Sequence, residues 1–289
     1  MYIKKIPVFF CEEMVVLKEQ ESPSPKKPKA LVEQWLQKYP IEIKEVIPVS
    51  LSQINAVHDP DFVTQVLSGF RDNGFGSRDV EVIDSLPYTN GSFLSAAREA
   101  LSNNLVAVSP TSGFHHATYD NAMGYCTFNG LMIAAKQLFE NGEASHIGIL
   151  DCDYHYGNGT DDILAQCDLG GEVIHYTGRQ SYPYDSKKFF HLLPHFLKSM
   201  VHCDILFYQA GADCHINDPF GGFLTTEEMR LRDQIVFQFC YDNSLPIVWN
   251  LAGGYQEEIL PNGTKSIQKV LDLHNNTMEE CLKVYSTLG

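Results

Sequence analysis

Short apolar runs alternate with longer amphipathic stretches through most of this chain. Five runs have the length and composition of buried strands, and they lie at 105–109, 147–151, 173–176, 205–209 and 247–251. Four stretches have the apolar spacing of helices, at 92–103, 126–141, 187–200 and 226–242. Strands that alternate with helices predict an α/β fold with a mainly parallel central sheet and helices on both faces. We therefore expect a three-layer α/β/α architecture.

Local signals add detail to this pattern. Thr225 with Glu228, and Thr277 with Glu280, have the spacing of a capping box, which marks the start of a helix. The segment 21–28, with the sequence ESPSPKKP, is the nearest approach to a linker in the chain. Its proline and serine content predicts a surface loop near the N-terminus.

Four clusters of polar or glycine-rich residues each follow a predicted strand. They lie at 115–116, 151–155, 213–218 and 253–255. Parallel strands end at one edge of a sheet, and open α/β sheets bind ligands at that edge. We therefore expect all four clusters to meet there. This common edge favours a single domain over residues 1–289, although the length alone would also allow two domains.

Composition excludes more functions than it selects. The formal net charge of −15 argues against a nucleic-acid partner and suits a cationic substrate, such as a lysine-rich peptide or a polyamine. The first residues lack the apolar core of a signal peptide, and no apolar run is long enough to span a membrane. Eight cysteines without a C-x-x-C pair favour reduced thiols in the cytoplasm. An export route that leaves no such mark in the sequence stays open.

The clusters after the second and fourth runs contain the residue types of a metal site. Asp153 and His155 point the same way on an extended backbone, because side chains alternate along a strand. Asp213 follows another strand and would supply a third ligand. Three protein ligands leave one position open for water, as in catalytic zinc sites. Two carboxylates and one imidazole suit Zn²⁺, and oxygen-rich sites also accept Fe²⁺ or Mn²⁺.

Other residues at the same edge have the chemistry that amide hydrolysis requires. His115 and His116 are the acid and base that would activate water and protonate the departing amine. Asp151 and Asn158 are the partners expected to hold the outer nitrogens of these rings. Tyr255, on a Gly-Gly turn, would donate a hydrogen bond to the developing oxyanion.

Together these segments resemble the signature blocks of the histone deacetylase superfamily, in the same order and with closely matching spacing. The blocks are SGFHHA at 112–117, GYCTFN at 124–129, DCDYHYGNG at 151–159, AGAD at 210–213 with DPFGG at 218–222, and LAGGY at 251–255. The resemblance covers most of the chain and implies the arginase/deacetylase fold. It leans towards the class II and class IV branches, partly because Asn158 stands where some branches carry aspartate.

The resemblance also implies roles for individual residues. It makes Asp153, His155 and Asp213 zinc ligands, His115 and His116 the acid/base pair, and Tyr255 the residue that polarises the carbonyl. The resemblance implies an acyl-lysine tunnel lined by Gly124, Tyr125 and Gly254, with Tyr182 as the facing wall. In relatives, main-chain oxygens around Asp151, Asp153 and His155 hold a structural potassium ion.

The chain departs from its relatives after Tyr182-Pro183. A long glycine-rich stretch follows this position in relatives, whereas here Tyr184-Asp185-Ser186 runs directly into a predicted helix. The missing stretch leaves the tunnel rim and the preferred acyl length open. Ser112 and Tyr125 replace the usual proline and phenylalanine, and neither change removes a catalytic group.

Four functions remain in competition. The first is a deacylase for acyl-lysine in proteins, for which a histone-like basic tail is one substrate. The second is an amidohydrolase for acetylated polyamines. The third is a binuclear, arginase-like hydrolase, but Gly157 and His215 stand where its second metal needs aspartates. The fourth is a non-catalytic module that binds acyl-lysine. Outside these blocks, His191 and His195 have metal-site spacing on a helix, but Pro194 and the absence of an adjacent glutamate favour a packing or surface role.

Overall fold

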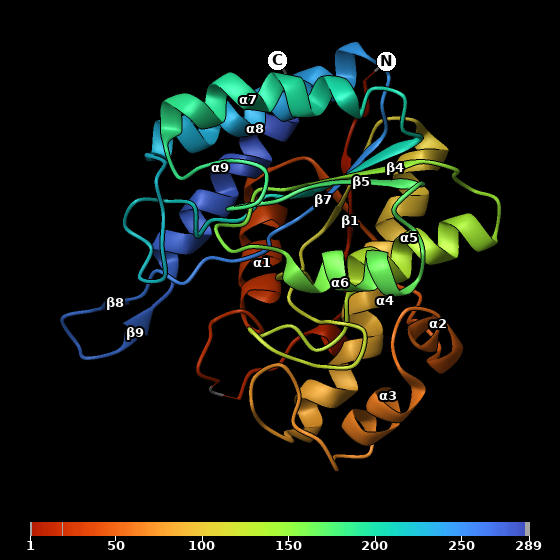
Figure 1. Ribbon diagram of the computed structural model, residues 1–289. Helices are drawn as coiled ribbons and strands as arrows, with labels where there is room; N and C mark the ends of the chain where they lie inside the picture. Colours follow the sequence, from red (N-terminus) through yellow and green to blue (C-terminus); the bar gives the residue numbers. More distant parts are fainter. Residues whose placement is uncertain (1, 19, 287–289) are drawn as a thin grey trace.

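The computed structural model describes residues 2–18 and 20–286. Its central sheet has seven strands in the order β2-β1-β3-β7-β6-β4-β5, and every pair of neighbours is parallel (Figure 1). The strands are β1 (Ile6–Phe9), β2 (Ile41–Lys44), β3 (Val106–Ser109), β4 (Ile147–Asp151), β5 (Val173–Tyr176), β6 (Ile205–Gln209) and β7 (Ile247–Asn250). The predicted parallel sheet is confirmed.

Helices cover both faces of this sheet. The helices are α1 (Lys27–Lys38), α2 (Leu51–Asn55), α3 (Pro60–Leu67), α4 (Val80–Asn103), α5 (Gly130–Glu140), α6 (Asn158–Gln166), α7 (Ser186–Ser199), α8 (Thr226–Asp242) and α9 (Gln268–Tyr285), with a 3-10 turn at Glu12–Met14. One apolar core joins the sheet to α1, α7, α8 and α9, and the other joins it to α2 through α6. The three-layer α/β/α architecture is therefore also confirmed. A small hairpin, β8 (Glu258–Ile259) and β9 (Lys265–Ser266), projects from the body (Figure 1).

Sequence patterns located most elements but not all of their ends. All five predicted strands are present to within one residue, whereas β1 and β2 were not predicted. The helix α8 has the predicted bounds, and its capping box at Thr225 is formed. The predicted helix start at Thr277 is wrong, because this residue lies inside α9. Its hydroxyl donates to Asp233 of α8 instead of capping a helix, with an Oγ1–Oδ2 distance of 2.7 Å.

The carboxyl ends of the four central strands lie in register. Ser109 of β3 pairs with Asn250 of β7, which pairs with Gln209 of β6, which pairs with Asp151 of β4. These four polar side chains are all fully buried. The loops that follow them carry the four clusters expected at this edge, so the alignment of the strands brings residues from distant parts of the sequence together.

The segment 21–28 does not form the surface loop that its composition predicts. Ser22 and Ser24 are buried, and Lys27 is completely buried at the start of α1. The reason is tertiary: the Ser112 hydroxyl donates to the Ser24 carbonyl (3.2 Å), which ties the segment to the loop after β3. The segment therefore forms part of the wall of the edge that carries the four clusters.

In the part of the chain that the structure describes, no helix is both long enough and apolar enough to cross a membrane. All eight cysteines are free thiols, and six of them are buried.

A buried ion pair connects α8 to the sheet edge. Arg232 Nε lies 2.9 Å from Asp233 Oδ1, and both side chains are excluded from solvent. Arg232 Nη1 also donates to the Gly211 carbonyl (2.9 Å), in the loop after β6. The carboxylate of Asp233 additionally accepts the hydroxyls of Tyr208 and Thr277. Removing one partner of such a pair leaves an uncompensated charge in a region of low dielectric.

We therefore expect Asp233→Ala to lower the free energy of unfolding by about 3–5 kcal/mol, as for other broken buried pairs. Urea denaturation followed by circular dichroism measures this change. Asp242→Ala on the same helix is the control, because Asp242 is exposed and its loss is expected to change stability by at most about 0.5 kcal/mol. Equal stabilities of the two variants would contradict the expectation.

Candidate active site

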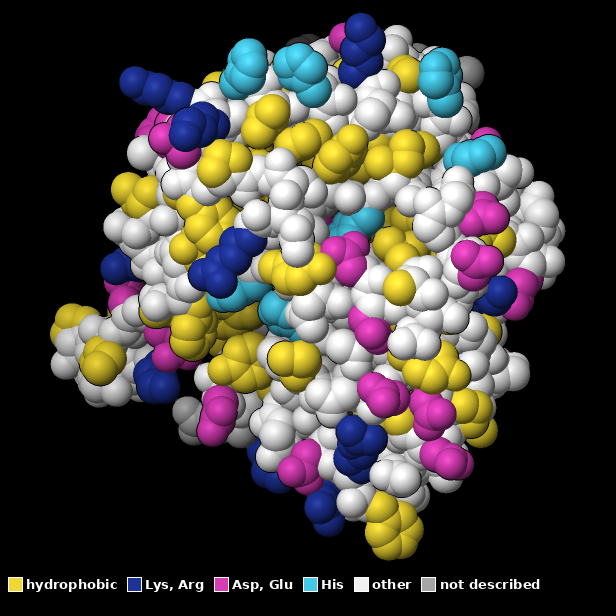
Figure 2. Space-filling model, in the orientation of Figure 1, with side chains coloured by type: hydrophobic (Ala, Val, Ile, Leu, Met, Phe, Trp, Pro, Cys, Tyr) yellow, Lys and Arg dark blue, Asp and Glu magenta, His cyan; other side chains and the backbone are white. Residues whose placement is uncertain are grey.

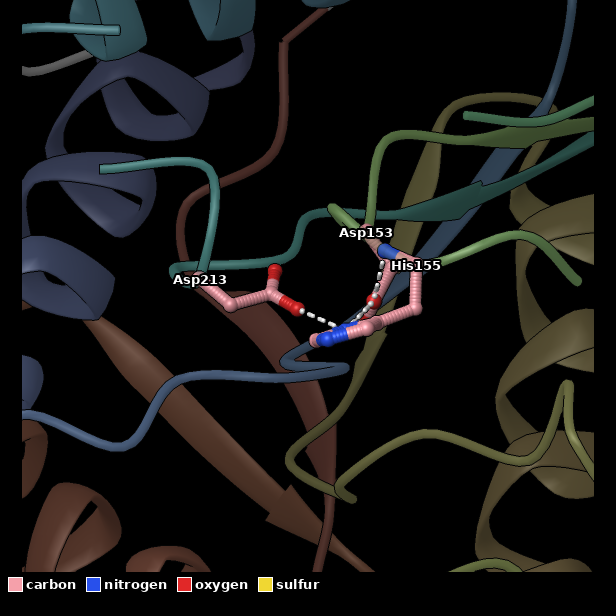
Figure 3. A group of neighbouring side chains, drawn as sticks. All are labelled: Asp153, His155 and Asp213. Atoms are coloured by element: carbon pink, nitrogen blue, oxygen red, sulfur yellow. Dashed lines mark hydrogen bonds and ion pairs between the residues drawn. The ribbon is translucent and has the colours of Figure 1, made fainter. Parts of the chain in front are cut away.

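Three potential metal ligands meet at the carboxyl edge of the sheet. Asp153 and His155 lie in the loop between β4 and α6, and Asp213 lies in the loop after β6 (Figure 3). His155 Nδ1 is 3.0 Å from Asp213 Oδ2 and 3.2 Å from Asp153 Oδ1. One ligand atom from each residue lies within 4.8 Å of the others. The structure thus brings together the three residues that the sequence singled out.

Main-chain amides fix the two carboxylates in this position. The Gly253 N–H donates to Asp153 Oδ2 (2.7 Å), and the Tyr154 N–H donates to Asp213 Oδ1 (3.0 Å). Gly253 approaches so closely that a Cβ there would lie 2.4 Å from Asp213 Oδ2 and 2.6 Å from Asp153 Oδ2. Only glycine fits at 253, which explains the glycine after β7 in physical terms.

The electrostatics of this group favour a bound cation. Burial and the nearby charge of Asp153 raise the pKa of Asp213 to about 8. Burying two carboxylates away from water costs free energy unless a positive charge compensates them. Two carboxylate oxygens and one imidazole nitrogen at this spacing are ligands that divalent transition metals accept. The chemistry of the donor set therefore fits a divalent metal ion, and His155 is its one ligand that is not fully buried.

The two tandem histidines stand beside the metal-ligand group. Their ring centroids are 4.2 Å apart. His115 Nδ1 lies 2.7 Å from Asp151 Oδ2, and His116 Nδ1 lies 2.7 Å from Asn158 Oδ1. His115 Nε2 is 3.6 Å from Asp153 Oδ1. Each histidine thus has the partner predicted for it at Nδ1, and the Nε2 atom of His115 faces Asp153.

Asp151 is itself held on several sides. Gln209 Nε2 and the Thr177 hydroxyl donate to its carboxylate, at 2.9 Å and 3.1 Å. His175 of β5 also lies next to it, with Nε2 3.9 Å from Asp151 Oδ2. The other ring nitrogen of His175 is 2.7 Å from Asp161 Oδ1. Sequence reasoning missed this second His–Asp pair, because only the pairing of β4 with β5 brings it beside Asp151.

A narrow pocket of about 10 Å³ leads to these residues. Its lining includes His115, Asp153 and Tyr255, with Gly124 and Tyr125 on one wall. Gly124 has a φ of +57° and packs on the His116 ring, where a Cβ would lie 2.5 Å from Cδ2. The pocket is large enough for about one water molecule. Histidine side chains gather in two places in Figure 2, along α7 and near the centre, among apolar side chains.

Tyr255 is positioned from both sides of its ring. Its amide donates to Asp218 Oδ2 (2.8 Å), and its ring lies 5.8 Å from that of Tyr125 and 4.9 Å from that of Phe220. Burial and the charges of Asp153 and Asp213 raise its pKa well above the usual value. The hydroxyl therefore keeps its proton and remains a hydrogen-bond donor.

Two residues expected in the tunnel lie elsewhere. Tyr182 is buried beneath the loop at 151–155, and its hydroxyl donates to the Asp151 carbonyl (2.9 Å) and the Asp153 carbonyl (3.3 Å). It does not line the pocket. Gly254 has its carbonyl directed at Lys27, and only the preceding Gly253 lines the pocket. Tyr182 lies in the interior because the connection after β5 is short and turns the chain back towards the core.

Lys27 is a functional candidate that sequence reasoning missed. Its ammonium group is completely buried and donates to the carbonyls of Ala252 (3.0 Å) and Gly254 (3.4 Å), on either side of Gly253. Burial lowers the pKa of Lys27 to about 8. Nothing in the local sequence marks it, since it follows another lysine in a polar segment. The contact is visible only in the folded chain, where it supports the turn that carries Tyr255.

Comparisons with known proteins agree with this geometry. The histone deacetylase domain matches residues 23–189, which is more than half of the chain. A probable deacetylase from Methanothermobacter thermautotrophicus is 28% identical over 211 residues, and the match covers 63% of each protein. The matched part therefore spans less than two thirds of that relative.

Two crystal structures resemble the whole chain. The HDA15 HD domain superposes with a TM-score of 0.77 at 17% identity, covering 99% of this chain and 92% of that domain. An acetylpolyamine aminohydrolase from Burkholderia pseudomallei gives a TM-score of 0.75 at 16% identity, covering 97% of this chain and 99% of that one. At such low identity these likenesses establish the fold, and they confirm the arginase/deacetylase-like architecture. Together with the domain match, they show that the chain belongs to the histone deacetylase family.

Proposed function

We propose that this protein is a metal-dependent amidohydrolase that removes acetyl or longer acyl groups from lysine side chains of proteins. One observation carries the proposal: three metal-ligating side chains stand beside two histidines whose outer nitrogens are each held by a partner. The two groups come together where His115 Nε2 lies 3.6 Å from Asp153 Oδ1. Amide hydrolysis needs this combination of a metal-ligand set and a proton-transfer pair.

Asp153, His155 and Asp213 would hold the metal ion. Two oxygens and one nitrogen suit Zn²⁺, and Fe²⁺ is the alternative that the same donors accept. When bound, such an ion supplies Lewis acidity, which lowers the pKa of a water molecule and polarises the acyl carbonyl. Gly253 and Tyr154, through their amides, keep both carboxylates aimed at one point.

In this proposal one histidine transfers the proton and the other stabilises charge. His116 donates its Nδ1 proton to the Asn158 amide oxygen, so its Nε2 carries the lone pair that can act as a base. That nitrogen accepts a proton from the attacking water and delivers it to the lysine nitrogen as the amide bond breaks. His115 is paired with the Asp151 carboxylate, so positive charge on its ring is stabilised beside the developing oxyanion. The pair thus separates proton transfer from charge stabilisation.

Tyr255 acts on the carbonyl oxygen. Its protonated hydroxyl donates to the oxyanion that forms as water attacks, and its rigid placement means that little reorganisation is needed during the reaction. Asp218 fixes its main chain from one side, and Lys27 fixes the carbonyls of the Gly-Gly turn from the other. We therefore assign Lys27 as a positioning residue for Tyr255.

The shape and charge around the pocket support an acyl-lysine substrate. The pocket has room for about one water molecule, so it excludes bulky groups from the metal-ligand residues. An apolar cavity of about 70 Å³ adjoins it and shares Ser24, Ser112, Gly113 and Tyr125 with its lining. The net charge of −15 suits a basic peptide such as a histone-like tail. These features favour an enzyme that acts on acylated, lysine-rich segments, and the free cysteines favour the cytoplasm as its compartment.

A second substrate class is acetylated polyamines. It is favoured by the structural likeness to an acetylpolyamine aminohydrolase. The two classes differ in the group that follows the amide nitrogen, which is a peptide in one case and a free cationic chain in the other. A rate comparison on acetyl-lysine peptide, a longer acyl-lysine peptide and acetylputrescine separates them, using protein loaded with a defined metal. A wide preference for acetylputrescine would overturn the protein-substrate assignment.

Metal binding tests the ligand set directly. We expect the wild-type protein to retain about one divalent ion per chain, because its three ligands converge on one point. Asp213→Ala is expected to weaken binding by more than the roughly 10–100-fold that removal of an outer-shell partner costs. Mass spectrometry of metals after dialysis measures both. Asp272→Ala, an exposed acid on α9, serves as the control and should retain the ion. Retention by both variants would contradict the assignment.

The catalytic roles of Tyr255 and His116 are tested by kinetics. Tyr255→Phe is expected to lower kcat by about 10²–10³-fold, as for loss of an oxyanion donor. His116→Ala is expected to lower kcat by about 10²–10⁴-fold. His191→Ala, on the exposed face of α7, is the control and should keep the wild-type rate. Unchanged kcat in either site variant, with metal content intact, would show that its side chain plays no part in the chemistry.

Lys27→Met tests the support of the Gly-Gly turn. The change keeps the aliphatic bulk but leaves the carbonyls of Ala252 and Gly254 without their donor, which costs about 1–3 kcal/mol for buried groups. We expect a lower kcat with nearly unchanged KM, because the Tyr255 turn loosens while the pocket remains. Lys27→Arg, which keeps a donor, should recover part of the rate. Equal rates for Met and Arg variants would argue against a positioning role.

A further inference from the structure

Four main-chain oxygens in the loop at 151–155 accept hydrogen bonds from side chains. The Tyr182 hydroxyl donates to the carbonyls of Asp151 (2.9 Å) and Asp153 (3.3 Å). Between them, the Cys152 carbonyl accepts the Cys214 thiol (3.1 Å). The next carbonyl, that of Tyr154, accepts the Tyr184 hydroxyl. Four consecutive oxygens of the loop that carries the metal ligands are therefore already engaged.

Two of these oxygens, those of Asp151 and Asp153, are among the three that would hold a potassium ion according to the family resemblance. Carbonyl oxygens bind potassium by replacing its hydration shell, so one ion must contact several of them at once. The Tyr182 hydroxyl oxygen bridges Asp151 and Asp153 in the way that a shared ion would. The residues present here therefore do not fit that ion.

The tyrosines reach this position because the connection from β5 to α7 is short. The Ser181 amide donates to the Thr177 carbonyl (3.0 Å), and Gly178 and Tyr182 form a bridge, so the chain turns back on itself. Gly178 passes so close to the loop that a Cβ there would lie 2.9 Å from the Tyr154 oxygen. The helix α7 begins at Ser186, and only its N-cap residue, Asp185, separates it from Tyr184. The segment that is long and glycine-rich in relatives is replaced here by a tight turn that delivers two hydroxyls.

Packing keeps both rings in place. Tyr182 lies edge-on to Phe189, with centroids 5.0 Å apart, and the Tyr184 ring stacks on that of Tyr154 at 4.1 Å. Burial raises the pKa of the Tyr182 hydroxyl well above its usual value, so the group keeps the proton that it donates. An unpaired buried carbonyl would be costly, and these contacts remove that cost without an ion.

We propose that Tyr182 and Tyr184 perform the structural task that potassium has in relatives, so that the loop bearing Asp153 and His155 is ordered without a monovalent cation. Both tyrosines are positioning residues, since they touch the main chain of the loop and not the pocket. This inference concerns the order of the loop and holds whichever acylated substrate the site takes.

The test compares cation content and stability with and without potassium. Zinc-loaded wild-type protein is expected to retain far less than about one potassium ion per chain, and its Tm should be the same in potassium and in tetramethylammonium buffers of equal ionic strength. Tyr182→Phe exposes the two carbonyls to a cation. We expect it to lose about 2–8 °C of Tm in tetramethylammonium and to regain at least half of this in potassium.

Tyr285→Phe is the matched control. It also removes a buried hydroxyl that donates to a main-chain carbonyl. This carbonyl belongs to Phe237 of α8, far from the loop at 151–155. Its Tm should not respond to potassium. A wild-type protein that retains about one potassium ion or is stabilised by it would overturn the proposal, as would a Tyr182→Phe protein whose Tm ignores potassium. If Tyr182→Phe does not fold, the potassium content and cation response of the wild-type protein decide the matter. Neither readout requires catalysis, so failure here is distinguishable from failure of the proposed function.

Discussion

The arrangement of this site depends on two carboxylates that face each other without solvent. Asp153 and Asp213 follow different strands, and both carboxylates lie within hydrogen-bond distance of the same imidazole nitrogen, Nδ1 of His155. Such a pair is unfavourable in a low dielectric unless donors and a cation offset it. The surrounding structure supplies the donors: the Gly253 amide donates to Asp153, and the Tyr154 amide donates to Asp213. The close approach of the Gly253 backbone to both carboxylates explains why glycine, and no larger residue, stands at position 253 in the loop after β7.

A second requirement is that the side chains and loops around this pair of carboxylates be held in place by hydrogen bonds. Asp151 is held by the side chains of a glutamine and a threonine, and it holds His115 in turn. Beneath the loop, tyrosine hydroxyls take up the main-chain oxygens, and beneath the Tyr255 turn a buried lysine does the same. In each case a long side chain from a distant segment brings one donor to a loop that has no regular hydrogen bonds of its own. The loops that carry the chemistry are thereby as constrained as the strands.

The shortened connection after β5 shows how one local change can alter several properties. It removes the segment that forms the tunnel rim in relatives, and it turns Tyr182 away from the pocket into the core. The same turn places Tyr184 against Tyr154. A residue that aligns with a substrate-facing position in the family therefore has a different task in this chain. Matching residue types in a motif does not by itself establish which way a side chain points.

The sequence by itself determined the layers of the fold, the common edge of the four clusters, and the membership of the metal-ligand and histidine groups. These features can be predicted because strand ends and the alternation of side chains depend on residues that are close together in the sequence. Only the tertiary structure decided the burial of segment 21–28, the use of Lys27 beneath the Tyr255 turn and the inward direction of Tyr182. Each depends on a contact between residues far apart in sequence, and neither polarity nor spacing within a segment contains information about the partner it will meet. For the same reason the helix expected to start at Thr277 was wrong, since its hydroxyl found Asp233 across the helix interface.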